Sequence, residues 1–238
     1  MTSVLVLRPS AVCPPAALGS WLVDAGARLD VVRPDTLPAT AGGYDAVVCL
    51  GGEMGANDDA EHPWLAGMRE LLAAAVRAGL PVLGICLGAQ LLAAATGGAV
   101  RKAPGGPESG TPPITLTAEA AGDVLLGGIG PTAPVVQSHA DEVHVLPPGA
   151  VRLAYSRRCA TQAFRLGDRA WGLQCHVETT PELVLEWARR DAAKAAACPP
   201  GQLDPAHLRA HHVDIERVWR PVAHRFVGVA ERARAHHR

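Results

Sequence analysis

The stretch "PVLGICLGAQLLAAATGG" (residues 81–98) places a cysteine between two glycines, after an apolar run and before a segment rich in Ala and Leu. The apolar run predicts a buried strand over 81–86, and the following segment predicts a helix over 87–96 that stops at a Gly-Gly pair. Cys86 therefore falls on a tight turn between a strand and a helix. The turn allows two interpretations of this cysteine.

In the first, Cys86 is a nucleophile, because a G-x-C-x-G turn between a strand and a helix has the nucleophile-elbow arrangement with cysteine in place of serine. The N-terminus of the following helix would point at the sulfur, where its partial positive charge lowers a thiol pKa and its free amides can hold an oxyanion. In the second, Cys86 is one more small, buried core residue. The choice depends on whether the chain supplies a base.

The segment "GLQCHVETTPE" (residues 172–182) supplies both a base and an acid. His176 ends an apolar strand, and Glu178 falls on the same side if the chain stays extended. A thiol nucleophile needs a base, and the base needs an orienting group. We therefore expect Cys86, His176 and Glu178 to act together as nucleophile, base and orienting acid.

Strand-like and helix-like patterns alternate through the first hundred residues. The expected strands cover residues 4–7, 28–34, 44–52 and 81–86. The expected helices cover residues 16–27, 64–79 and 87–96. This alternation indicates βαβ units, and hence a three-layer α/β fold whose mostly parallel central sheet is flanked by helices.

From about residue 99 to 175 the pattern changes to short strands with Pro- and Gly-rich turns, which predicts a small antiparallel extension. A helix is expected over 180–196, and Pro221 should start or kink the last helical segment. We expect residues 1–198 to form the catalytic domain. Residues 199–238 should be a C-terminal helical extension packed on the same domain.

The chain has 238 residues and a net charge of −1, so no basic excess argues for nucleic acid or a membrane surface as partner. Its start lacks the features of a signal peptide, and no apolar stretch reaches the roughly 18 residues of a membrane span. We expect a cytoplasmic location.

Six cysteines occur without a CxxC pair, which predicts free thiols. His207, His211 and His212 lie close in sequence, but no acidic pair or thiolate accompanies them. With no zinc spacing and no glycine motif for nucleotides, we expect neither a metal nor a cofactor.

Four ordered motifs give a more specific interpretation. "GICLGAQLLA" and "GLQCHVE", together with "YDAVVCLGGEMGANDDAEHPWL" and "SHADEVHVLPPGAVRLAYS", resemble the class I glutamine amidotransferases. The likeness covers residues 44–190 and is greatest to the stand-alone relatives of the GMP synthase glutaminase domain. It implies a flavodoxin-like fold and a Cys-His-Glu triad that hydrolyses glutamine.

The resemblance gives each triad residue a role. Cys86 would attack the γ-amide carbon of glutamine to form a γ-glutamyl thioester. His176 would protonate the departing ammonia and then activate water, while Glu178 orients the imidazole.

The resemblance also implies binding positions around the triad. The backbone N–H groups of Gly52 and Leu87 would hold the oxyanion. Gln90 matches a position whose side chain contacts the substrate, and Ser138 and His139 match the segment that binds the α-amino and α-carboxylate ends of glutamine.

Four residues depart from the family pattern. Glu53 stands where proline usually follows the Gly-Gly pair, and Ala89 replaces a frequent histidine. Cys175 replaces the common phenylalanine before the histidine, and Val177 replaces the common proline after it. We expect Cys175 to be a packing residue, and Glu53 to lie close enough to the site to alter specificity.

The leading hypothesis is thus a glutaminase that releases ammonia for a separate acceptor synthase. A stand-alone γ-glutamyl peptidase or hydrolase, which acts on another γ-glutamyl compound, is an alternative. A catalytically degenerate binding subunit is a further one.

Overall fold

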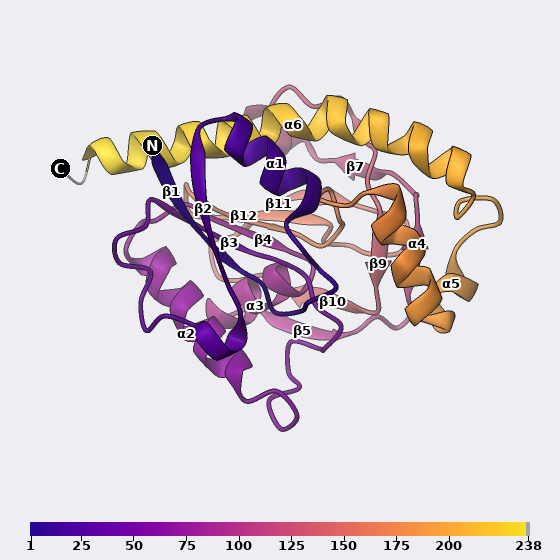
Figure 1. The fold of residues 1–238 in the computed structure, drawn as a ribbon, viewed down its shortest axis with the longest axis horizontal. Coiled ribbons are helices and arrows are strands. Elements are labelled where there is room, and N and C mark those ends of the chain that lie inside the picture. Colours follow the sequence, from indigo (N-terminus) through magenta and orange to yellow (C-terminus); the bar gives the residue numbers. More distant parts are fainter. Residues whose placement is uncertain (237–238) are drawn as a thin grey trace.

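In the computed structural model, which describes residues 1–236, a main sheet of nine strands lies between two layers of helices (Figure 1). From edge to edge the strands are β2 (Ala27–Val32), β1 (Thr2–Leu7), β3 (Ala46–Cys49), β4 (Val82–Ile85), β13 (Ala170–Leu173), β12 (Ala163–Leu166), β11 (Val151–Tyr155), β7 (Ile114–Leu116) and β8 (Thr132–Ala133). Neighbours from β2 to β13 pair in parallel, and those from β13 to β8 pair antiparallel. The predicted three-layer α/β fold is confirmed, with a larger antiparallel part than the small extension expected.

The alternation of side chains along β1 explains the two helical layers. Val4 and Val6 belong to the core beneath α1 (Ala16–Asp24) and α6 (Pro205–His236). Leu5 and Leu7 belong to the core against α2 (Trp64–Arg77) and α3 (Leu87–Ala95). Successive residues of a strand point to opposite faces, so a strand that is apolar throughout must be covered on both sides.

Two small sheets and several short elements complete the fold. The first sheet pairs β5 (Ala99–Lys102) with β10 (Asp141–Val145), and the second pairs β6 (Glu108–Gly110) with β9 (Gln137–His139). The other elements are η1 (Pro34–Thr36), η2 (Ala118–Gly122), α4 (Pro181–Arg190) and α5 (Ala192–Ala197).

The prediction of one helix over residues 180–196 was wrong, because the chain breaks between α4 and α5 at Asp191. The backbone there has φ −124° and ψ 90°, outside the helical region, and the Asp191 side chain accepts a hydrogen bond from the amide of Lys194. Aspartate is among the preferred N-cap residues, so it begins a new helix instead of continuing the old one.

Pro221 was expected to start or kink the last helical segment, and it does not start it, since α6 begins at Pro205 and continues through this proline. A kink at Pro221 stays a prediction. Proline removes one backbone donor from the helix. Buried neighbours compensate: the Trp219 indole donates to the carbonyl of Pro134 at 2.8 Å, and the Phe226 ring packs edge-on against Trp171.

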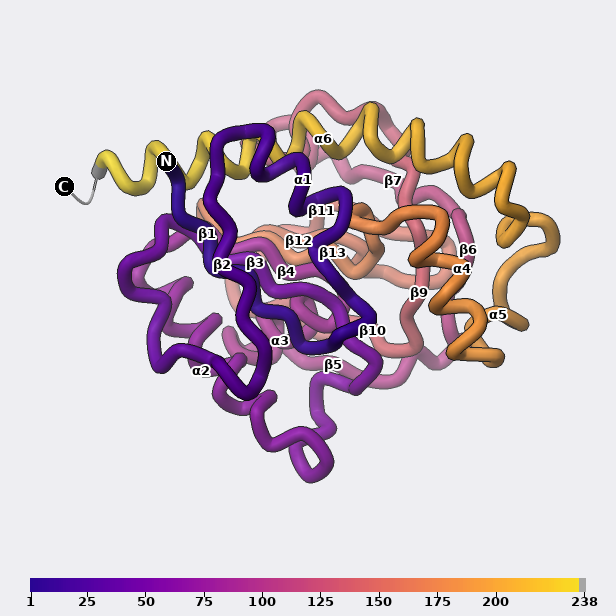
Figure 2. Tube along the Cα trace, in the orientation of Figure 1, coloured from indigo at the N-terminus to yellow at the C-terminus, as the bar shows by residue number. Residues whose placement is uncertain are grey.

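The start of the chain lies beside the end of α6 (Figure 2). Thr2 Oγ1 donates to Glu231 Oε1 at 3.3 Å, and Arg234 donates to the carbonyl of Met1 at 3.2 Å. The division of the chain into residues 1–198 and 199–238 stays a prediction, and residues 237 and 238 lie outside the described part. Among the described helices, none combines the length and apolar character needed to cross a bilayer.

The first turn of α3 lies directly on the carboxyl end of β3. A Cβ atom at Gly88 would come 2.0 Å from the carbonyl oxygen of Cys49, and one at Gly84 would come 2.6 Å from the carbonyl carbon of Gly88. Neither backbone can move aside without leaving the sheet or the helix, so both positions require glycine.

We predict that Gly88→Ala lowers the free energy of unfolding by about 3 kcal/mol or more, because the added methyl group overlaps backbone atoms. Urea unfolding measures the loss. Gly122→Ala is the matched control, since a Cβ there meets nothing within 4 Å, and it should change stability by no more than about 0.5 kcal/mol. Equal stability of the two variants would contradict this account of the turn.

Candidate active site

Cys86 lies on a strained turn between β4 and α3. Its backbone has φ 50° and ψ −109°, a conformation that residues other than glycine rarely adopt, and its side chain is buried. Such strain costs on the order of 1–3 kcal/mol and persists only where the surroundings enforce it. Here the Cys86 amide donates to Leu173 O at 2.7 Å, and the Cys86 carbonyl accepts from the Gln90 amide at 3.0 Å.

His176 and Glu178 form a buried pair beside this turn. The Nδ1 atom of His176 lies 2.7 Å from Glu178 Oε1, and the other carboxylate oxygen accepts from the Val177 amide at 2.9 Å. Two backbone hydrogen bonds join His176 to Val136. The ring of Trp187 packs against the imidazole with centroids 4.7 Å apart, so the orientation of His176 is fixed on several sides.

The pKa of His176 reflects this environment. Burial lowers the pKa, but the Glu178 carboxylate and the Cys86 side chain raise it by more, so the net effect is an increase from 6.5 to about 10. Gly51 separates the two side chains: a Cβ placed there would lie 3.2 Å from His176 Cε1 and 3.6 Å from Cys86 Cβ. The structure therefore brings together all three residues of the expected triad.

Five other cysteines are free thiols whose pKa values are all raised, with burial as the largest cause. A thiol with a raised pKa forms less of the reactive thiolate. Cys175 is fully buried, as a packing residue should be. These thiols are Cys13, Cys49, Cys159, Cys175 and Cys198.

Gln90 joins a hydrogen-bonded chain that ends at Cys86. Its amide nitrogen lies 3.1 Å from Gln174 Oε1 and 3.3 Å from the carbonyl of Asp141, and Gln174 Nε2 lies 3.7 Å from Cys86 Sγ. Sequence reasoning missed Gln174. The signal was present, because Gln174 and His176 are two residues apart at the end of one strand and so lie on the same side of it.

The expected oxyanion positions are neighbours in the structure, since a Cβ at Gly52 would lie 2.7 Å from the Leu87 side chain. Ser138 lines the cavities beside the triad. The His139 ring is buried, with Nδ1 2.9 Å from the carbonyl of Asp141 and Nε2 3.3 Å from Glu108. Its side chain thus holds the Ser138 segment in place.

Two cavities meet at this site. The smaller, about 40 Å³, is lined by Cys86 and Gln90, and the larger, about 300 Å³, is lined by His176 and residues of α4 and α5. Four residues line both cavities: Gly52, Glu53, Ser138 and Lys194.

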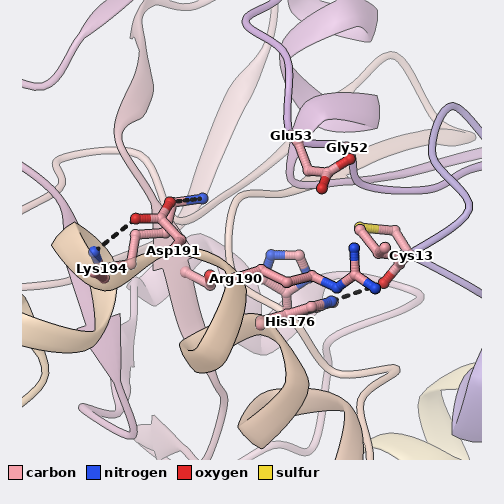
Figure 3. A pocket seen from close by; sticks show the side chains of 11 residues that line it. Cys13, Gly52, Glu53, His176, Arg190, Asp191 and Lys194 are labelled. Carbon is pink, nitrogen blue, oxygen red and sulfur yellow. Dashed lines mark hydrogen bonds and ion pairs between the residues drawn. The ribbon is translucent and has the colours of Figure 1, made fainter.

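Figure 3 shows the larger cavity, with Glu53 on one side and Asp191 and Lys194 on another. Cys13 and Trp187 complete its wall, and the Trp187 indole donates to the carbonyl of Val12 at 2.7 Å. Sequence reasoning did not find Cys13, Trp187 or Lys194 as lining residues, and no spacing in their segments indicates them.

The three histidines near the start of α6 hold that helix to the rest of the fold. Nε2 of His207 lies 2.9 Å from Thr111 Oγ1, and Nε2 of His211 lies 2.9 Å from the carbonyl of Val135. His212 contacts the hydroxyl of Thr179, beside Glu178, at 3.0 Å. Within residues 1–236, no group of three or more His, Cys, Asp or Glu side chains is arranged to hold a metal ion.

Comparison of this chain with known proteins identifies its family. The model of the glutamine amidotransferase class-I family matches residues 17–186. The glutamine amidotransferase-like protein YfeJ of Salmonella typhimurium is 35% identical over 170 residues, which cover 69% of this chain and 70% of that protein. A crystal structure of a glutamine amidotransferase from Methylobacillus flagellatus superposes with a TM-score of 0.82 at 30% identity, over 98% of this chain and 95% of the other.

A glutamine-hydrolyzing GMP synthase subunit of Natronomonas pharaonis is 44% identical over 100 residues, 42% of this chain. The match spans about half of that relative, 53% of its length. Since the family model covers most of the chain and one relative matches more than two thirds of it, this chain belongs to the class I glutamine amidotransferase family.

Proposed function

We propose that this chain hydrolyses the γ-amide of glutamine at Cys86 and releases ammonia for a separate acceptor enzyme. One observation carries the proposal: Cys86 has a positive φ at the N-terminus of α3, beside a His176–Glu178 pair with a 2.7 Å contact. This arrangement supplies a nucleophile, a base and a group that orients the base.

In the proposed reaction, His176 holds the proton of the Cys86 thiol while the thiolate attacks the γ-carbonyl carbon of glutamine. The backbone N–H groups of Gly52 and Leu87 stabilise the oxyanion that develops there. His176 then protonates the leaving nitrogen, and ammonia departs from a γ-glutamyl thioester. A water molecule, deprotonated by His176, cleaves the thioester, and Cys86 recovers its proton.

Glutamine would bind at the junction of the two cavities. Gln90 is fixed by its contacts to Gln174 and to the Asp141 carbonyl, so its side chain is positioned before substrate arrives. Ser138 lies on β9, which pairs with β6 and continues from the Val136–His176 bridge. This connection supports a role for the Ser138–His139 segment in holding the α-amino and α-carboxylate groups.

An ammonia-accepting partner is part of the proposal. Several relatives are named as one subunit of a glutamine-hydrolyzing GMP synthase, and such a name implies a second polypeptide that uses the ammonia. We propose such a synthase as the partner, with glutamine as the substrate of the present chain.

A second candidate function is the hydrolysis of larger γ-glutamyl amides by the chain alone. The observation that favours it is the cavity of about 300 Å³ lined by His176, the residue that would protonate the leaving group. A chain that only binds ligands through a degenerate site is the third candidate, and the presence of all three triad residues argues against it.

We predict that a glutamine-analogue electrophile labels Cys86 and that Cys86→Ala lowers kcat for glutamine hydrolysis at least about 10³-fold. The raised pKa values of the other thiols keep them protonated, so mass spectrometry should find one adduct. Assays of glutamine hydrolysis with and without a candidate synthase distinguish an inactive site from one that is active only with its partner.

Cys198→Ser is the control for this labelling, because Cys198 is the most exposed of the other thiols and lies outside the site. It should leave both the adduct and the turnover unchanged. Absence of an adduct on Cys86, or turnover that survives Cys86→Ala, would refute the proposed mechanism and favour the degenerate binding protein.

The raised pKa of His176 predicts a dependence of stability on pH. The folded protein keeps a proton on His176 up to about pH 10, whereas the unfolded chain loses it near 6.5, so the stabilisation is complete below pH 6.5 and disappears as the pH rises through 10. The difference in unfolding free energy between the native protein and His176→Gln should therefore shrink over this range.

Urea unfolding at several pH values between 6 and 10 measures that difference. The exposed His144 offers a matched control, and His144→Gln should track the native protein at every pH. A gap between native protein and His176→Gln that stays constant with pH would show that His176 is not held protonated in the folded state.

A further inference from the structure

We propose that Glu108 is a positioning residue for the binding of glutamine, and that it acts through β9. Its carboxylate holds this strand from behind, so that Ser138 stands at the site. The inference rests on the proposed hydrolysis of glutamine at Cys86, and it concerns how the segment that binds glutamine is kept in place.

The strand β9 has two faces with different surroundings. Gln137 and His139 are both buried, with 1% and 3% of their surface exposed. Ser138 between them lines both cavities beside the triad, while Gln137 lines neither and His139 only the smaller. Side chains alternate along a strand, so the two buried neighbours lie on the face opposite Ser138. The contacts of Gln137 and His139 therefore determine where Ser138 stands.

Glu108 is the centre of the contacts behind this strand. It lies opposite His139 where β6 pairs with β9, and its carboxylate is 3.3 Å from the ring nitrogen Nε2 of His139. The same carboxylate accepts hydrogen bonds from the Ser156 hydroxyl and the Gln162 amide, each at 2.9 Å. The Gln162 amide also donates to the side-chain oxygen of Gln137 at 3.2 Å. Glu108 thus reaches both buried residues of β9, one directly and one through Gln162.

The ring of His139 is held at two edges. Its Nδ1 lies 2.9 Å from the carbonyl of Asp141, and a carbonyl only accepts, so Nδ1 is the donor. Its Nε2 faces the carboxylate of Glu108 on the other side. The ring cannot turn without losing one of these contacts, and the backbone of His139 is fixed with it.

Burial makes this network costly to break. Glu108 has 4% of its surface exposed, and Gln162 has none. A buried polar group that loses its partner has no water to replace it, so the loss costs more than an exposed hydrogen bond contributes. Glu108 lines neither cavity, so it holds β9 without a place for itself beside the substrate.

The base of the triad is anchored by other contacts. His176 exchanges two backbone hydrogen bonds with Val136, at 2.8 and 2.9 Å, and lies 2.7 Å from Glu178. These contacts do not involve Glu108. Loss of the Glu108 carboxylate should therefore displace Ser138 while the triad keeps its geometry, which predicts weaker binding of glutamine and unchanged chemistry.

Steady-state kinetics of the full chain test this division. Glu108→Ala should raise KM for glutamine about tenfold and leave kcat within about twofold of the native value. Glu108→Gln keeps the length of the side chain, and its amide can still accept from Gln162 and donate to the His139 ring, so KM should return to within about threefold. Glu61→Ala is the matched control, because Glu61 is exposed and lines neither cavity, and it should leave both constants unchanged.

Labelling of Cys86 distinguishes weaker binding from a damaged turn, and it needs no turnover. A diazoketone analogue of glutamine keeps the α-amino and α-carboxylate groups, whereas iodoacetamide lacks both. In Glu108→Ala, the diazoketone concentration that gives half the maximal labelling rate should rise about tenfold. The labelling rate with iodoacetamide should stay within about twofold of the native rate, since that reagent needs only the reactive thiolate.

Glu108→Asp provides a second test if Glu108→Ala does not fold. It keeps the charge but withdraws the carboxylate by one methylene group, so KM should rise about threefold with kcat unchanged. Thermal unfolding of each variant checks that it is folded. If neither variant folds, Glu108 serves the stability of the fold instead, and the proposal is overturned.

The remaining outcomes are equally decisive. An unchanged KM in folded Glu108→Ala, a fall in kcat as large as the rise in KM, or an equal loss of labelling by both reagents would overturn the role of Glu108. Each of these leaves the proposed function intact, provided that the diazoketone labels Cys86 in the native protein. If the native protein is not labelled, the proposed function itself fails, and this inference fails with it.

Discussion

The whole site depends on one close contact, in which the first turn of α3 rests on the carbonyl of Cys49 at the end of β3. Only glycine at position 88 permits it. The contact brings the N-terminus of α3 to the end of β4 with no room for an intervening loop, which forces Cys86 into its positive-φ conformation. Because β4 pairs in parallel with β13, the chain that leaves β13 delivers His176 to the same edge of the sheet. The strained backbone of Cys86 and the nearby position of His176 are thus consequences of how α3 meets β3 and how β4 pairs with β13.

Sequence analysis predicted those parts of the structure that short-range rules determine. The turn at Cys86 needs glycine two positions away on either side, and a pair such as His176 and Glu178 needs a spacing of two in extended chain, so both leave a pattern within a few residues. The alternation of apolar strand patterns with helix patterns likewise predicts a sheet covered by layers of helices. The alternation along the chain after β13 would have placed Gln174 on the same side as His176, but its contact with Gln90 depends on how α3 packs against β13.

The wall of the larger cavity could not be predicted in this way. Cys13 and Lys194 are 181 residues apart in the sequence, and they line one cavity because α4 packs over His176 through Trp187. At Asp191 the chain can either continue α4 or end it and cap a new helix, α5. Local helix propensity is compatible with both outcomes, so it does not predict the break. At Pro221, burial of the flanking aromatic side chains outweighs a local rule that would have begun a new helix.

The placement of α6 has a consequence for the order in which the molecule is made. This helix follows every other described element in the chain, yet it covers the face of β1, the first strand, and its His212 holds Thr179 beside Glu178. A ribosome therefore produces Cys86 and His176 before the helix whose His212 contacts Thr179. The face of the sheet that α6 covers therefore stays uncovered until α6 itself has been synthesised.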